Sequence, residues 1–442
     1  MSTTPPPPPG GSTARRGPGE DGPGRRQQQV TRTRDALNER RTLEHKPRVR
    51  IYPDDDPARA EYLYVEQVVT TRSTDRGAVV ERLRDLVPPG VTWTESDGDP
   101  IPGVTTITFT GGEVDVTGVC RVLDELSPGV AMPMSIVHIT PTGTCPATEA
   151  VPSSGRPVPA PTAEESAGAG VRMVVIDTGR RQDVEAQHDW LRQPDITGDP
   201  EDASDVGHYR GHGTFVCGVI RTMAPAAAID VNGILITLGA VDEADLAVEL
   251  WEAATHDRPQ VVSMSAGTTS RDGYPPIALA VAVEMLTAEG VLLVAAAGND
   301  GNEEAFYPAY FSAADARISR PANDLVVSVG AMDAGCTQRA PFSNHGWPVV
   351  YAQGCDVVNG YPRGRYQYQE TPLAPSWATF PAGMATWDGT SFATPLVSGM
   401  VAAQMTVGGM DARQAWATLF RRARRSKQPG AGPVLRPQDV RP

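Results

Sequence analysis

Four short segments of the sequence carry side chains that together could act on an acyl group. They are VRMVVID, GHGT, VLLVAAAGN and DGTS, and their polar residues are Asp177, His212, Asn299 and Ser391. A serine hydroxyl is a weak nucleophile until an imidazole takes its proton, and a carboxylate then fixes the imidazole tautomer and stabilises the imidazolium. An amide N–H can stabilise the oxyanion that develops. These are the residue types that acyl transfer through a covalent intermediate requires.

Each of the four residues also has an ordinary structural explanation. Ser391 could cap the helix that starts in SFATPLVSGM, because serine is a common N-cap residue. Asp177 could bind backbone N–H groups at a turn, His212 could be a core histidine, and Asn299 could belong to the turn that follows it. A helix N-terminus, however, also offers unpaired N–H groups and a positive dipole end to an oxyanion. The joint occurrence of all four residues favours the catalytic interpretation.

Strands and helices alternate through the region that contains these residues. The nearly continuous apolar strands predict a doubly wound, mostly parallel sheet with helices on both faces. Ligands bind beyond the carboxyl ends of the strands in such sheets, which is where Asp177 and Asn299 stand. The expected strands are VRMVVID, AIDVNGIL, QVVSMSAG, VLLVAAAGN and LVVSVGAMD, and the expected helices are GHGTFVCGVIRTM, DEADLAVELWEAAT and PPIALAVAVEMLTAEG.

The segments VVIDTG, GHGT, AAAGND and GTSFATP resemble the Asp, His, Asn and Ser motifs of the subtilisin-like serine peptidases, the subtilases. The chain order Asp, His, Ser is the one that subtilisin has. The resemblance covers about residues 170–425 and implies a subtilisin-like fold. It also implies that Asp177 orients His212, that His212 acts as general base and then acid, and that Ser391 attacks. Asn299 and the backbone N–H of Ser391 would form the oxyanion hole.

A further segment, MSAG, resembles the strand on which subtilases bind a substrate as an added β-strand. The resemblance implies that Met264, Ser265, Ala266 and Gly267 bind the substrate backbone, with side-chain pockets supplying selectivity. Ala266 replaces a larger apolar residue of the family, so we expect an altered pocket wall. The alternative is an ordinary buried strand end.

The sequence departs from the family pattern near the histidine and in two long segments. Phe215 stands where the family commonly has a second histidine, and Cys217 follows, either as a mercurial-sensitive thiol or as a small packing residue. Residues 303–323 and 360–385 look like insertions between the Asn and Ser motifs. They would either rim the cleft, with a lid as one form, or simply elaborate the surface.

The region before the peptidase-like part shows the element order βαββαβ, which is typical of a small ferredoxin-like domain. By order and position it resembles the propeptide of many subtilases, which chaperones folding and then blocks the cleft. That resemblance implies an intramolecular inhibitor or chaperone and self-cleavage within about residues 140–168. A permanently attached accessory domain is the alternative.

The amino-acid composition also indicates where the chain divides into disordered and folded regions. Pro, Gly, Arg and Gln dominate the N-terminus, and a Pro/Ser/Ala-rich stretch follows the small domain. We therefore expect a disordered region at 1–50, in which the charged residues 31–50 could form a solvent-facing helix. We expect the βαββαβ domain at 51–145, a linker at 146–168, the catalytic domain at 169–426 and a flexible tail at 427–442.

Charge and composition limit the partners. The 442 residues include 39 Lys and Arg and 53 Asp and Glu, giving a formal net charge of −14, which argues against nucleic acid held by phosphate contacts. No segment has the apolar length of a signal peptide or membrane span, so we expect a cytoplasmic protein without a membrane partner, with unconventional export left open. The expected partner is a protein or peptide substrate.

No cofactor or metal is expected. The cysteines have no CxxC spacing, and the acid-rich residues 183–205 show no regular ligand pattern, so structural calcium has no motif to support it. The five cysteines are Cys120, Cys145, Cys217, Cys336 and Cys355.

Three functions remain open from the sequence. The first is an endopeptidase that hydrolyses peptide bonds through an acyl-enzyme on Ser391. The second is a transpeptidase or macrocyclase, in which an amine captures the same acyl-enzyme and lid-like insertions exclude water. The third is a catalytically silent binding module on a subtilase scaffold, which the presence of all four active-site residues disfavours.

Overall fold

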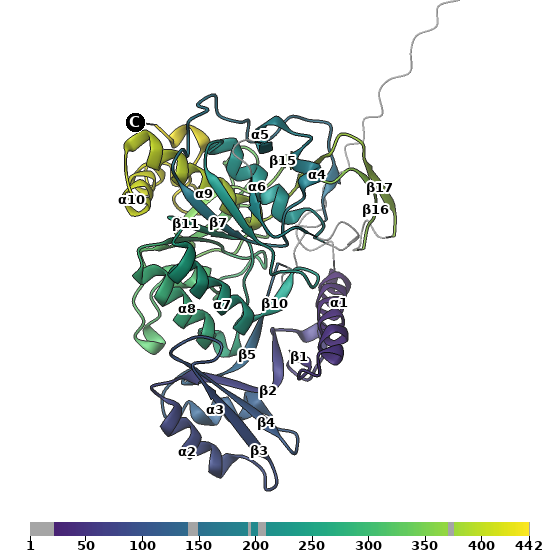
Figure 1. Cartoon of the computed structure of the whole chain (residues 1–442), viewed down its shortest axis with the longest axis vertical. Coiled ribbons are helices and arrows are strands. Elements are labelled where there is room, and N and C mark those ends of the chain that lie inside the picture. Colours follow the sequence, from purple (N-terminus) through teal and green to yellow (C-terminus); the bar gives the residue numbers. More distant parts are fainter. Residues whose placement is uncertain (1–21, 140–148, 193–195, 202–208, 370–374, 442) are drawn as a thin grey trace, which may run out of the picture.

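A parallel seven-stranded sheet forms the centre of the protein. The computed structural model describes residues 22–139, 149–192, 196–201, 209–369 and 375–441 (Figure 1). The strand order is β14-β13-β12-β11-β7-β9-β8, and every neighbouring pair is parallel, as predicted from the sequence. The strands are β7 (Arg172–Ile176), β8 (Thr197–Gly198), β9 (Ala228–Asn232), β11 (Val261–Met264), β12 (Leu292–Ala296), β13 (Val326–Met332) and β14 (Val350–Gln353).

Helices cover both faces of this sheet, because successive side chains of a strand point to opposite faces. Val175 of β7 belongs to the buried cluster beneath α6 and α9, whereas Val174 and Ile176 belong to the cluster beneath α7 and α8. The helices are α6 (His212–Met223), α9 (Thr390–Gly408) and α10 (Ala412–Ala423) on the first side, and α7 (Glu243–Glu252) and α8 (Ile277–Ala288) on the second.

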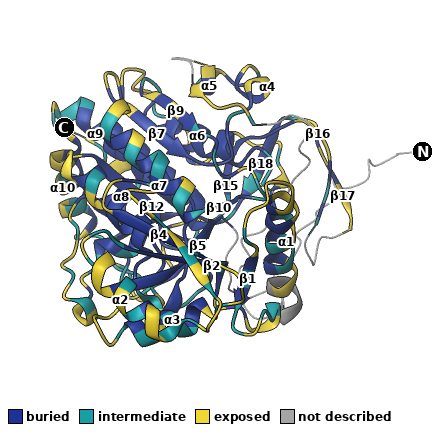
Figure 2. Ribbon diagram, turned by 60° about the horizontal axis from the view of Figure 1, so that its bottom comes forward, coloured by how far each residue is buried: buried dark blue, intermediate teal, exposed yellow. Residues whose placement is uncertain are grey.

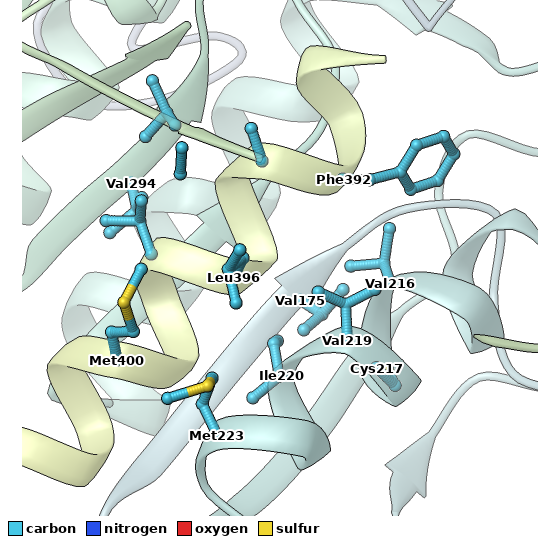
Figure 3. Close-up of a cluster of buried hydrophobic side chains, with 14 of the residues drawn as sticks. Val175, Val216, Cys217, Val219, Ile220, Met223, Val294, Phe392, Leu396 and Met400 are labelled. Carbon is cyan, nitrogen blue, oxygen red and sulfur yellow. The ribbon is translucent and has the colours of Figure 1, made fainter. Parts of the chain in front are cut away.

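Helix α9 passes close to α6. Figure 3 shows Leu396 of α9 and Ile220 of α6 in one buried cluster with Val175 and Val294 of the sheet. Gly399 permits the close approach, because a Cβ at this position would lie 2.7 Å from the carbonyl oxygen of Ile220. The N-terminal turn of α9, which carries Ser391, is thereby held against the sheet.

A second, antiparallel sheet precedes the catalytic region and shows the βαββαβ order. Its four main strands lie in the order β5-β2-β4-β3, and helices α2 and α3 cover one face. The other face packs on α7 and α8 of the catalytic region, as the lower part of Figure 1 shows. The elements are β1 (Val49–Tyr52), which pairs with β2, and β2 (Tyr62–Arg72), α2 (Arg76–Leu86), β3 (Thr92–Asp97), β4 (Val104–Thr110), α3 (Val116–Leu123) and β5 (Ala131–His138).

The N-terminal region contains a long helix, α1 (Gly22–Leu43), which lies within the region expected to be disordered and begins earlier than the solvent-facing helix considered for residues 31–50. Val30 and Leu37 are buried in one cluster with β1, β2 and β5, and the opposite face of the helix is exposed (Figure 2). Two apolar residues in a polar helix are too weak a sequence signal, so its stability depends on contacts that are distant in the chain. Residues 1–21 lie outside the described part.

Parts of the expected linker and tail are also packed. Val151–Pro152 form β6, which pairs with β18 of the second insertion. Near the C-terminus, Leu435 is buried and donates its N–H to the Tyr351 carbonyl at 2.8 Å. Composition alone did not show these pairings, because they depend on partners far away in sequence. The strands concerned are β6 (Val151–Pro152), β15 (Val357–Gly360), β16 (Gly364–Gln367), β17 (Trp377–Phe380) and β18 (Met384–Trp387).

The remaining elements are short. None of the helices in the described residues is long and apolar enough to cross a membrane. The other elements are β10 (Ala240–Asp242), α4 (Gln182–Glu185), α5 (Asp189–Arg192), the π-helix η2 (Ala253–Asp257) and the 3₁₀ helices η1 (Pro57–Arg59), η3 (Arg271–Gly273), η4 (Ala309–Ser312), η5 (Ala316–Ile318) and η6 (Pro437–Asp439).

The contact between α9 and α6 leads to the first prediction. Gly399→Ala should lower the free energy of unfolding by about 1–3 kcal/mol, because the added methyl group forces the two helices apart. Gly408→Ala is the control, since only the flexible Met410 side chain lies near its Cβ position. Urea unfolding measures both changes, and an equal effect of the two substitutions would contradict the proposed close contact.

Candidate active site

Asp177 and His212 form a buried pair beyond the carboxyl end of β7. Oδ1 of Asp177 accepts a hydrogen bond from Nδ1 of His212 at 2.7 Å and one from the Thr178 N–H at 2.7 Å. Both side chains are almost fully buried, at 0% and 2% exposure. Because the carboxylate only accepts hydrogen bonds, it fixes the tautomer in which Nδ1 carries the proton. Nε2 of His212 is therefore the nitrogen that can take a proton.

Aromatic rings hold the imidazole from several sides. The centroid of the His212 ring lies 5.2 Å from that of Trp387 and 5.4 Å from that of Phe392. Phe215 packs against the same two rings, at 5.7 and 4.8 Å, so the departure from the family pattern adds an apolar support beneath the histidine. Sequence reasoning missed Trp387, for which the only signal was its position just before the DGTS turn.

Ser391 lies at the N-terminus of α9, where the family resemblance places the nucleophile. Its Oγ donates to the Ser265 carbonyl at 3.3 Å, and the Ser265 Oγ donates to the Ser391 carbonyl at 2.9 Å. Among the described contacts, no hydrogen bond joins Ser391 to His212. The link is the next residue, Phe392, which packs on the imidazole. Catalytic hydrogen bonds are often long without substrate and shorten in the substrate complex.

Asn299 is oriented by the residue that precedes the serine. Its Oδ1 accepts hydrogen bonds from the Thr390 N–H at 2.9 Å and from the Thr390 Oγ1 at 2.8 Å. The carboxamide oxygen is thereby held, and Nδ2 is the atom left to donate to a substrate oxygen. Thr390 was not among the predicted site residues, although it lies within the GTSFATP motif.

The four residues of the MSAG segment begin at the end of β11. Met264 is its last residue, Ser265 contacts Ser391, and Gly267 pairs with His138 at the end of β5. The N–H of His138 donates to the Gly267 carbonyl at 3.0 Å, and the Gly267 N–H returns a bond of 3.1 Å. Ala266 is buried between these contacts. An extended segment of this same chain therefore lies on the strand that the resemblance assigns to substrate.

The opposite side of this segment is paired as well. The Ile139 N–H donates to the Gly239 carbonyl at 2.9 Å, and β10 pairs antiparallel with β5. The end of β5 thus lies between β10 on one side and Gly267 on the other. This is the geometry of β-strand addition, with backbone bonds on both edges.

Charged residues strengthen the contact between the two regions. Arg271, whose side chain is fully buried, binds both carboxylate oxygens of Asp124 at 2.7 and 2.9 Å. Arg41 of α1 forms an ion pair with Asp242 of β10 at 2.5 Å. Such buried, bidentate contacts are costly to break singly, because the remaining charge loses its partner.

Glu243 links the two regions through a buried carboxyl group. The carboxyl accepts N–H groups from Ser135 of β5 at 2.9 Å and from Ala278 at the start of α8 at 2.7 Å. Burial raises the pKa of Glu243 to about 7, and these N–H donors oppose the increase. The residue was not singled out in the sequence, because its role depends on two distant backbone segments.

The structure also bears on the cysteine and metal alternatives. Cys217 is completely buried in the core, and burial raises its thiol pKa far above the usual range, which supports the packing interpretation. The described residues contain no group of three or more His, Cys, Asp or Glu side chains placed to hold a metal ion. The acid-rich segment at 183–205 is described only in part.

Comparison with known proteins places this site in a family. The model of the subtilase family matches residues 160–433, and the chain belongs to that family. It is 31% identical over 248 residues to the thermostable alkaline protease of Halalkalibacterium halodurans, covering 53% of this chain and 56% of that protein. It is 30% identical over 246 residues to subtilisin Savinase of Lederbergia lenta, covering 53% and 76%. The chain spans about half the length of the first of these relatives.

A solved structure supports the fold beyond the catalytic region. Fervidolysin from Fervidobacterium pennivorans, described as a keratinolytic enzyme related to subtilisin, aligns with a TM-score of 0.55 and 19% identity. The alignment covers 85% of this chain and 61% of fervidolysin. At this identity the likeness concerns the fold alone.

The site geometry predicts one activated serine. A fluorophosphonate should add a single phosphonyl group to the wild type and none to Ser391→Ala, and His212→Ala should slow the reaction by about a hundredfold or more. Ser398→Ala is the matched control, because Ser398 is another buried serine of α9 that bonds Ser263. Intact mass measures the adduct. Absence of an adduct both from the wild type and from a variant in which the docking of the N-terminal domain is weakened, Asp124→Asn, would contradict the activation of Ser391.

Proposed function

We propose that the protein is a serine endopeptidase that hydrolyses peptide bonds through an acyl-enzyme on Ser391. The observation that carries this proposal is the buried hydrogen bond of 2.7 Å between Asp177 and His212, at the sheet edge where α9 presents Ser391. A buried carboxylate held on an imidazole, beside a serine at a helix N-terminus, is an arrangement suited to acyl transfer. A protein or peptide is the substrate of this proposal.

In the proposed reaction, Nε2 of His212 takes the Ser391 proton while Oγ attacks the substrate carbonyl carbon. The imidazolium that forms is stabilised by Asp177, and it then gives its proton to the leaving amine as the peptide C–N bond breaks. Water, activated by the same imidazole, attacks the acyl-enzyme ester and releases the carboxylic acid. The close rings of Trp387 and Phe392 exclude bulk solvent from one side of this transfer.

The oxyanion of each tetrahedral intermediate would be stabilised by Asn299 Nδ2 and the backbone N–H of Ser391. The two hydrogen bonds from Thr390 support this assignment, since they hold the Asn299 carboxamide in one orientation before substrate arrives. Donors that need no reorganisation in the transition state contribute most to catalysis.

We also propose that the N-terminal domain inhibits the peptidase from within the same chain. Its last strand, β5, lies between β10 and Gly267, where a substrate strand would bind. The self-cleavage expected within residues 140–168 stays a prediction. Residues 140–148 lie outside the described part, and within the described remainder of that range Val151 and Pro152 are paired with β18.

Transpeptidation is a second candidate that one observation favours. Trp387 ends β18, directly after the second insertion, and its ring lies on His212, while Tyr361 from the same insertion packs on Trp387 with ring centroids 6.0 Å apart. A shielded imidazole would let a bound amine compete with water for the acyl-enzyme. Product mass distinguishes the two reactions, since hydrolysis adds water and cyclisation does not.

The third function, a catalytically silent binding module, does not need the serine hydroxyl. Retained function in Ser391→Ala would therefore favour it over both reactions.

The orientation of Asn299 predicts its effect on turnover. Asn299→Ala should lower kcat by about 10² to 10³ with little change in KM, because the lost donor acts mainly on the transition state. Thr390→Val should cause a smaller decrease, since the Thr390 N–H still holds the amide. Asn302→Ala, in the same turn, is the control. Steady-state kinetics on a peptide substrate measures all three, and an unchanged kcat for Asn299→Ala would remove it from the oxyanion hole.

The interface predicts that breaking one buried ion pair releases the cleft. Asp124→Asn should raise the rate of fluorophosphonate labelling of the full chain at least tenfold, because buried Arg271 loses its bidentate carboxylate partner across the interface and keeps only Asp272 of its own region, so that docking weakens. Asp85→Asn is the matched control, since this exposed carboxylate lies on α2 of the same domain. An equal rate in both variants would contradict inhibition by the docked domain.

A further inference from the structure

We infer that Phe306 fills the pocket for the substrate side chain that precedes the scissile bond, and that the enzyme therefore acts after small residues such as glycine, alanine and serine. This inference rests on the proposed endopeptidase function and names its substrate class. Phe306 lies in the first of the two insertions, and its ring is only 4% exposed.

The docked end of β5 shows how an extended peptide lies relative to Ser391. His138 is opposite Gly267 in an antiparallel register. A peptide bound in the same register has one residue opposite Gly267, as His138 is here, and the residue two positions further toward its C-terminus opposite Ser265. The carbonyl oxygen of Ser265 is 3.3 Å from Ser391 Oγ. The peptide residue opposite Ser265 is the one whose carbonyl carbon Ser391 attacks, and it is called the acyl residue below.

Two backbone segments flank the side chain of the acyl residue. One is the peptide-binding segment that ends at Gly267. The other is the turn of Gly298 and Asn299, because the acyl carbonyl oxygen must reach Asn299 to be stabilised. The acyl side chain therefore enters the space between Gly267 and Gly298.

The ring of Phe306 occupies this same space. A Cβ built on Gly267 would lie 2.2 Å from Cε1 of Phe306, and one built on Gly298 would lie 3.0 Å from its Cγ. The backbone of the next residue is fixed by two hydrogen bonds between Thr268 and Tyr307, at 2.8 and 2.9 Å. Because the ring is packed between two glycines and its backbone is anchored, it has little room to move aside for a large side chain.

The pocket is tested with two small covalent probes, the diphenyl 1-aminoalkylphosphonates that carry the alanine or the phenylalanine side chain. Ser391 Oγ forms a bond to phosphorus, one phenoxide leaves, and the serine proton passes through His212 to that phenoxide. The full-length wild type should react at least tenfold faster with the alanine analogue. Phe306→Ala should reverse or abolish that preference by accelerating the phenylalanine analogue.

Phe311→Ala is the matched control, because it removes a buried phenyl ring from the same insertion and should leave the ratio of the two rates unchanged. If Phe306→Ala does not fold, Phe306→Leu should shift the ratio in the same direction by a smaller factor. A wild type that prefers the phenylalanine analogue, or a ratio unaffected by both Phe306 variants, would overturn the inference. Failure of both the wild type and Asp124→Asn, in which docking of the N-terminal domain is weakened, to react with either probe and with a fluorophosphonate would instead contradict the proposed function itself.

Discussion

The buried hydrogen bond between Asp177 and His212 is the interaction on which the rest of the site depends. A carboxylate without solvent is costly unless hydrogen bonds compensate it, and here Thr178 and His212 supply them. The bond also requires α6 to start directly against the end of β7. Gly213 meets that requirement, because a Cβ there would lie 2.3 Å from the Gly179 carbonyl oxygen. The glycines around the histidine therefore serve the approach of the helix to the sheet.

The two ends of the site are built on different supports. Ser391 and Thr390 belong to α9, which is anchored along the sheet by an apolar cluster, whereas the MSAG segment begins at the end of β11 and is followed by Thr268, which is hydrogen-bonded to Tyr307 of the first insertion. The reciprocal hydrogen bonds of Ser265 and Ser391 join these supports at one point. A change in either support reaches Ser391 through that pair, so residues distant from Ser391 help to define its position.

The sheet, its helices and the positions of the four candidate site residues could be predicted because their signals are local, whereas the catalytic roles of these residues stay a prediction. The strands are continuous apolar runs, and Asp177, Asn299 and Ser391 each stand at the end of a readable segment. The supporting residues carry no such signal. Trp387 and Thr390 contribute through partners about 90 or more positions away, and α1 supplies only Val30 and Leu37 to the buried apolar cluster that it shares with β1, β2 and β5. Composition alone did not show that α1 and Leu435 are packed, because their partners lie on strands that are distant in the sequence.

The inhibition that we propose for β5, which is paired with Gly267, would not depend on the concentration of the protein, and the following consequences hold for that proposal. An inhibitor that belongs to the same chain faces the cleft at an effective concentration that linker geometry sets and that dilution cannot change. A substrate must therefore compete with a neighbour that never diffuses away, and opening of the cleft becomes a unimolecular event. The amount of active enzyme then follows the docking equilibrium within each molecule, whatever the abundance of the protein.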